Sequence, residues 1–138
     1  MLPISATTIR LFLHILAATV WVGGQVALAG VVPVVRQLGG RDAARAVARR
    51  FQLIAWPAFA VLIVTGIWNL LAAKIGDQSS AYLTTLSVKL ALVVVSGSAA
   101  AGHIVLARRR PALGGALAGL ALLAAVGATF VGVLLTTG

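Results

Sequence analysis

Four long apolar runs, separated by short polar segments, occupy most of this chain of 138 residues. The runs cover residues 9–35, 51–73, 82–107 and 112–136. Each run is long enough for one crossing, because a membrane-spanning helix needs roughly 20 apolar residues. Barrel strands are shorter and alternate apolar with polar residues, a pattern that these runs lack. The sequence therefore predicts an all-α polytopic membrane protein, folded as a four-transmembrane-helix antiparallel bundle in a single domain over residues 1–138.

The composition points to lipid as the solvent of this chain and excludes several kinds of chemistry. Hydrophobic residues make up 61% of the chain and charged residues only 9%, whereas soluble domains carry about 25% charged residues. Cysteine is absent, which excludes disulfides, thiolate metal sites and cysteine nucleophiles. Two acidic residues are too few for carboxylate catalysis, and the sequence has no hydrolase, nucleotide or phosphate motif. No catalytic residue is predicted, and the lipid bilayer is the expected partner.

Basic residues cluster in two of the segments between the apolar runs. Eight of the eleven lysines and arginines are found there: Arg36, Arg41, Arg45, Arg49, Arg50, Arg108, Arg109 and Arg110. The opposite side has only Arg10 and Lys74. Short loops rich in Lys and Arg stay in the cytoplasm, so we expect a plasma (inner) membrane protein with both termini periplasmic. Because no basic face alternates with aromatic residues, we expect no nucleic-acid partner.

Polar residues inside two of the apolar runs repeat at helical spacing. In the first run the stripe is His14, Ala18, Trp21 and Gln25; in the third it is Lys89, Val93, Ser96, Ala100 and His103. Polar side chains in a bilayer are costly and usually face other helices or a cavity. We therefore expect both stripes to face the interior of the bundle. Arg41, Arg45 and Arg49 also follow helical spacing, which predicts that the second helix begins before its apolar run. We expect this extension to lie along the headgroups, where anionic lipid attracts the arginines.

His14, Asn69 and Lys89 fall at a similar depth on three different predicted helices, given a rise of about 1.5 Å per residue. We expect them to converge on one cavity in the outer half of the bundle, with Trp21 and Trp68 close by. His103 lies near the opposite face, about 20 Å from His14 along the bundle, so the two histidines are not expected to share a metal. Simpler roles remain open at every position. Lys89 can extend to the surface, His14 can pair with a neighbouring helix, His103 can be interfacial, and the tryptophans can be packing residues.

Small residues recur four apart in the last apolar run. They are Gly115 and Gly119, followed by the series Ala124, Ala128 and Gly132. This spacing lets helix backbones approach closely. It predicts close packing, either inside the bundle or in a homo-oligomer formed through the fourth helix.

Three short motifs in order resemble those of known membrane proteins. The first is His14 followed by Trp21-Val22-Gly23-Gly24, the second is Thr65-Gly66-Ile67-Trp68, and the third is Lys89-Leu90-Ala91-Leu92. Together they resemble the CopD-like (copper resistance D) membrane proteins and, more distantly, the HemJ-type protoporphyrinogen oxidases. The first resemblance implies copper handling in the inner membrane. The second implies binding of haem b, with functional roles for a histidine and a lysine at the positions of His14 and Lys89.

Three functions follow as alternatives. Copper handling would rest on His14 as the metal ligand, although Cu(I) prefers thiolate and thioether ligands and the one methionine is Met1. A haem-based redox protein would use His14 as an axial ligand, with Trp21 and Trp68 beside the ring and Arg10 or Lys89 paired with a propionate. In a non-catalytic membrane subunit, the polar stripes would only fix the helix register.

Overall fold

The computed structural model describes residues 3–137, which are almost entirely helical. Helix α1 spans Ala6–Ala72, a short 3-10 helix η1 spans Ile75–Asp77, and helices α2 and α3 span Ser80–Leu106 and Pro111–Thr137. No strand occurs among the described residues, so the predicted all-α class is confirmed. Polar caps define where two helices begin: the hydroxyl of Ser5 accepts from the N–H of Thr8, and that of Ser79 accepts from the N–H of Tyr82.

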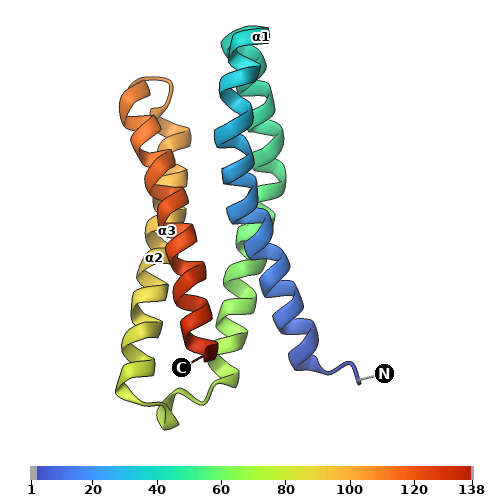
Figure 1. Ribbon diagram of the computed structural model, residues 1–138, viewed down its shortest axis with the longest axis vertical. Helices are drawn as coiled ribbons and strands as arrows, with labels where there is room; N and C mark the ends of the chain where they lie inside the picture. Colours follow the sequence, from blue (N-terminus) through green and yellow to red (C-terminus); the bar gives the residue numbers. More distant parts are fainter. Residues whose placement is uncertain (1–2, 138) are drawn as a thin grey trace. The chain divides into compact units, whose positions relative to one another are not determined.

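Helix α1 is a hairpin of two arms that meet at Gly40 (Figure 1). The backbone there has φ 74° and ψ −173°, the one non-helical conformation inside the helix. A side chain would strain this conformation, which glycine adopts readily. Residues 6–39 and 41–72 therefore run antiparallel, and His14 of the first arm contacts Thr65 of the second. The helical conformation predicted for the segment of Arg41, Arg45 and Arg49 is observed.

Helices α2 and α3 form a second antiparallel hairpin, tied by two side-chain hydrogen bonds. The hydroxyl of the buried Ser96 donates to the carbonyl oxygen of Ala121 at 2.8 Å. Near the turn, His103 Nδ1 donates to the carbonyl oxygen of Gly114 at 2.7 Å. A Cβ at Gly114 would lie 2.7 Å from the Cα of Ala107, so only glycine allows this approach of the two backbones.

The small residues of α3 divide between two faces. Gly114, Ala121, Ala124, Ala125 and Ala128 are buried. In contrast, Gly115 and Gly119 are exposed, and an added Cβ at either would meet nothing within 4 Å. The predicted series Ala124, Ala128 and Gly132 thus lies on the packed side of the helix, with Gly132 against Lys89. Gly115 and Gly119 do not serve packing between α2 and α3.

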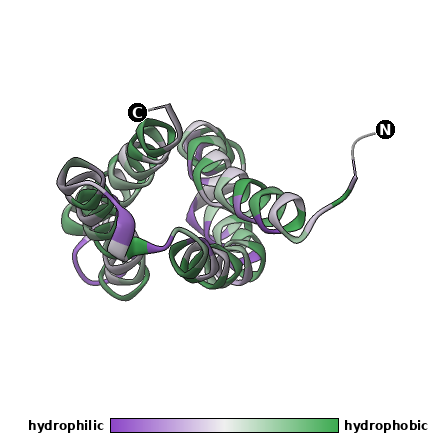
Figure 2. Ribbon diagram, turned by 90° about the horizontal axis from the view of Figure 1, so that it is seen from below, coloured by the Kyte–Doolittle hydropathy of each residue, from purple (hydrophilic) through white to green (hydrophobic). Residues whose placement is uncertain are grey.

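Large apolar side chains are exposed along every helix. They include Leu38 (85% exposed), Leu71 (78%) and Leu123 (72%), and hydrophobic residues dominate the ribbons in Figure 2. The buried apolar positions are mostly alanines, with one tryptophan and one leucine. Helices α1, α2 and α3 are each long and apolar enough to cross a membrane. Because lipid solvates such surfaces and water does not, the chain is a membrane-embedded helical protein.

The chain divides into two compact units, Met1–Lys74 and Ile75–Gly138. Each unit contains one hairpin: α1 forms the first, and α2 and α3 form the second. Both hairpins have their arginines at the turn end. Arg41 follows Gly40 directly, and Arg108–Arg110 connect α2 to α3.

Candidate functional site

The first hairpin joins its two arms through a polar contact between His14 and Thr65. His14 Nδ1 lies 2.8 Å from the hydroxyl oxygen of Thr65. That hydroxyl lies 2.7 Å from the carbonyl oxygen of Val61 and 3.2 Å from that of Leu62, one turn earlier on the same arm. Thr65 is buried with 3% of its surface exposed, and His14 is half-buried. The pair therefore sits within the helical interface of the hairpin.

The geometry fixes the direction of the histidine hydrogen bond. A threonine hydroxyl has one hydrogen, and the contact with the Val61 carbonyl requires that hydrogen because a carbonyl can only accept. The Thr65 oxygen then accepts from Nδ1–H of His14. In this tautomer Nε2 carries the lone pair of the neutral ring. Ligating histidines are held in the same way, with one ring N–H donating to a neighbouring acceptor and the other nitrogen facing the metal.

Two more residues of this hairpin lie near His14: Gly66 is next to its ring, and Arg10 is one helical turn away. Gly66 lies beside the ring, at a distance where an added Cβ would make ordinary van der Waals contact, 3.6 Å, with Cε1 of His14. Arg10 precedes His14 by one helical turn on the same arm. Its Nε is buried and has no hydrogen-bond partner among the residues that the structure describes. A buried donor of this kind is costly, so an anionic acceptor at this level would stabilise it.

An aromatic cluster lies deeper in the same hairpin. The ring of Trp21 is 4.3 Å from that of Phe59 and 5.5 Å from that of Trp56, measured between centroids. Trp56 and Phe59 meet edge to face at 5.9 Å. Trp21 is 4% exposed, so the cluster fills the interface between the two arms, two helical turns from His14 in the direction of Gly40. Trp56 belongs to this cluster but is only half-buried.

Asn69 and Trp68 lie toward the open end of the first hairpin, whereas Gln25 of the first polar stripe lies toward its turn. Asn69 follows Thr65 by one turn on the second arm and is half-buried. Because His14 pairs with Thr65 in an antiparallel hairpin, Asn69 is level with Arg10 and about 6 Å from the level of His14. Trp68 is 42% exposed. Gln25 donates to the carbonyl oxygen of Trp21 on its own arm.

Lys89 belongs to the second hairpin and packs against α3. A Cβ at Gly132 would lie 3.1 Å from Nζ of Lys89. The polar residues of this stripe, Lys89, Ser96 and His103, thus all face α3. Two of them bind its backbone carbonyls, so this stripe fixes the register of the second hairpin. The convergence of Lys89 with His14 and Asn69 stays a prediction.

Metal-binding side chains are sparse. Within residues 3–137, no group of three or more His, Cys, Asp or Glu side chains is placed to hold a metal ion. His103 uses Nδ1 to hold the backbone of α3. Both histidines therefore donate from Nδ1, His103 to a backbone carbonyl and His14 to a side-chain hydroxyl.

Thr65 is the site residue that the sequence analysis missed, although it belongs to a recognised motif. The signal for it was present in the chain. If the reversal is placed at Gly39-Gly40, position 14 of an antiparallel hairpin pairs with position 65. A hydroxyl opposite a histidine in an apolar interface then predicts a hydrogen bond.

Comparison with known proteins yields no relative: no family model, no curated protein and no solved structure matches the chain.

Proposed function

We propose that this chain is a b-type haem-binding redox protein of the membrane, with His14 as an axial ligand of the iron. The observation that carries the proposal is the hydrogen bond of 2.8 Å between His14 Nδ1 and Thr65. This bond selects the tautomer with its lone pair on Nε2, the nitrogen that an iron ion requires. The proposal agrees with the more distant resemblance to the HemJ-type proteins, which implies functional roles for His14 and Lys89.

The residues around His14 fit a haem better than a copper centre. A b-type haem needs one protein ligand and an apolar surrounding, and the first hairpin supplies one oriented histidine on an apolar helix. The buried Nε of Arg10, one turn away, suits a propionate. A copper site built from protein side chains needs several soft or imidazole donors, and the described residues offer no group of three metal-ligating side chains. Copper handling, which the CopD resemblance implies, is therefore the second choice.

The proposed assembly is an antiparallel four-helix bundle of the two hairpins in the bacterial inner membrane. Both hairpins carry their arginines at the turn end, which supports cytoplasmic turns and periplasmic termini. When bound, the haem would supply one-electron redox chemistry in a low-dielectric setting. The protein's own contribution would be to hold His14 in one tautomer, to neutralise a carboxylate with Arg10 and to exclude water.

The visible absorption spectrum of the purified full chain tests this function. We expect a Soret band after reconstitution with haem b, because His14 can ligate the iron. The variant His14→Ala should lose the band. The matched control is His103→Ala, which removes the histidine that binds the backbone of α3 and should keep it. Helical content in each variant, measured by circular dichroism, shows whether the protein has folded.

Three results would contradict the proposal. In the first, folded wild-type protein fails to bind haem b while it retains stoichiometric copper. In the second, His14→Ala binds haem as tightly as wild type. Purification without haem or copper, together with failure to bind either one, would leave the non-catalytic subunit as the function.

A further inference from the structure

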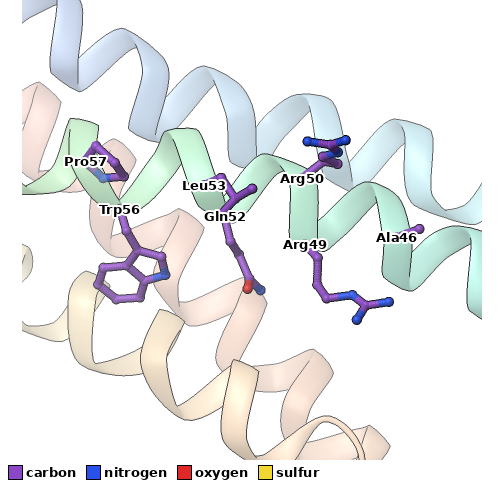
Figure 3. A pocket seen from close by; sticks show the side chains of 7 residues that line it. All are labelled: Ala46, Arg49, Arg50, Gln52, Leu53, Trp56 and Pro57. Atoms are coloured by element: carbon purple, nitrogen blue, oxygen red, sulfur yellow. The ribbon is translucent and has the colours of Figure 1, made fainter.

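A shallow hollow on the second arm of α1 lies beside the arginine-rich turn. Its lining comes entirely from this arm: Ala46, Arg49, Arg50, Gln52, Leu53, Trp56 and Pro57. Figure 3 shows the side chains of Arg49, Gln52 and Trp56 directed to the same side of the helix. The guanidinium group of Arg49, an amide and an indole N–H thus lie on one side of the hollow, and the guanidinium group of Arg50 points to its other side. Every one of these groups donates hydrogen bonds.

The charge at the hollow is not balanced by the chain itself. The protein has eleven basic residues and only two acidic ones. One of the acids, Asp42, pairs with Arg45 at 3.3 Å, the ion pair found among the described residues. Arg49 and Arg50 are both exposed. Because guanidinium groups bind phosphate oxygens in bidentate fashion, the hollow has the chemistry of a phosphate site.

The depth of these residues matches the layers of a membrane surface. Arg49 and Trp56 are separated by seven residues, about 10 Å along a helix. Arginines near the ends of membrane helices lie at the headgroups, and tryptophans favour the boundary between headgroups and hydrocarbon. On the hydrocarbon side of the hollow, Leu53 is 68% exposed and Pro57 is exposed as well. The groups that can donate to a phosphate and the exposed apolar side chains therefore occur in the same order as the headgroup and the acyl chains of a phospholipid.

We propose that this hollow binds one anionic phospholipid, with the headgroup phosphate between Arg49 and Arg50 and an acyl chain along Leu53 and Pro57. The inference is independent of the haem proposal, because it uses none of the residues around His14. Gln52 and Trp56 donate hydrogen bonds to the phosphate or to the ester oxygens below it. The bound lipid would neutralise the arginines of this arm and anchor the turn at the headgroup level.

Native mass spectrometry of the full chain in detergent tests this site, with phosphatidylglycerol, phosphatidylcholine and inorganic phosphate as the probes. We expect wild type to bind phosphatidylglycerol more tightly than phosphatidylcholine and to bind inorganic phosphate weakly. The double variant Arg49→Gln/Arg50→Gln should lose affinity for phosphatidylglycerol by about fivefold for each arginine, since exposed side chains can be replaced without unfolding. The matched control Arg108→Gln/Arg109→Gln removes the same charge from the other hairpin and should retain the affinity.

Three results would overturn the site. Equal affinity of wild type for phosphatidylglycerol and phosphatidylcholine would show that the headgroup charge is not recognised. Equal losses in the two double variants would show general attraction to basic residues. Inorganic phosphate that displaces phosphatidylglycerol at similar concentration would show a site for free phosphate, in which Leu53 and Pro57 have no part.

Discussion

At the scale of single residues, the hydroxyl of Thr65 gives His14 a role that composition alone does not reveal. The hydroxyl accepts from Nδ1 of His14 and donates to the carbonyl of Val61. These two partners belong to different arms, so one side chain both orients the ring and links the two arms of the hairpin. The same bond is the one expected if His14 pairs with a neighbouring helix, because a buried ring N–H needs an acceptor.

Replacing Thr65 with valine removes the hydroxyl and keeps the shape of the side chain. We expect the affinity for haem b to fall by about 10–100-fold, the usual effect of losing the partner of a ligating histidine. Thr65→Ser keeps the hydroxyl and is the control, with affinity close to wild type. Titration of the protein with haem, followed by absorbance, measures both. Equal affinities of the valine and serine variants would show that Thr65 does not orient the ligand.

The sequence predicted His14, but not its partner, for a physical reason. A polar residue in a long apolar run is conspicuous because burying it is costly. Threonine is less conspicuous, since its hydroxyl can bond to the carbonyl one turn earlier on its own helix, as Thr65 does. Its second role depends on the register of the two arms. That register follows from the position of Gly40, which hydropathy does not mark.

At the scale of elements, both hairpins are built on small residues and on side chains that bind backbone carbonyls. Apolar runs correctly predicted helices, because only helices satisfy the backbone in hydrocarbon over such lengths. They predicted the bounds of α2 and α3 to within two residues, but they did not predict that helix continues through most of the segment between the first two runs. Residues 36–50 are polar, but they are helical on both sides of Gly40, since arginine and alanine continue a helix readily.

The rotation of α3 about its axis also lay beyond the sequence pattern. Small residues occur on more than one face of this helix, and their spacing alone cannot select the packed face. The hydrogen bonds from Ser96 to Ala121 and from His103 to Gly114 select it. They direct Gly114 and Ala121 toward α2 and leave Gly119 exposed.

Two alanine variants in α3 test this arrangement. Gly114→Ala places a Cβ 2.7 Å from the Cα of Ala107, and we expect it to lower the free energy of unfolding by about 1–3 kcal/mol. Gly119→Ala meets nothing within 4 Å and should raise stability by up to about 1 kcal/mol, through helix propensity. Thermal unfolding in detergent, monitored by circular dichroism, compares them. A more stable Gly114→Ala protein would show that the packed face of α3 is a different one.

At the scale of the whole molecule, hydropathy determines the solvent of the two hairpins and charge provides their orientation signal. The exposed apolar side chains make lipid the solvent of the helices, and the arginines stand at the hairpin turns. Lys74 is the basic residue of the segment that links the two hairpins. An arginine-rich turn is costly to move across a bilayer. Each hairpin therefore carries its own orientation signal, and the two signals agree in direction.

Reporter fusions test the resulting topology. A reporter active only in the periplasm should be active at either terminus, and a reporter active only in the cytoplasm should be active in the turns at Gly40 and Arg109. Replacing the eight arginines of the two turns with glutamine should mix the orientations, because the positive-inside signal is lost. The control variant Arg10→Gln/Lys74→Gln removes the opposing charges and should keep wild-type activity at both termini. If the cytoplasmic reporter is active at a terminus of the unaltered chain, the topology is wrong. Either the number of crossings is not even or the turns do not lie in the cytoplasm.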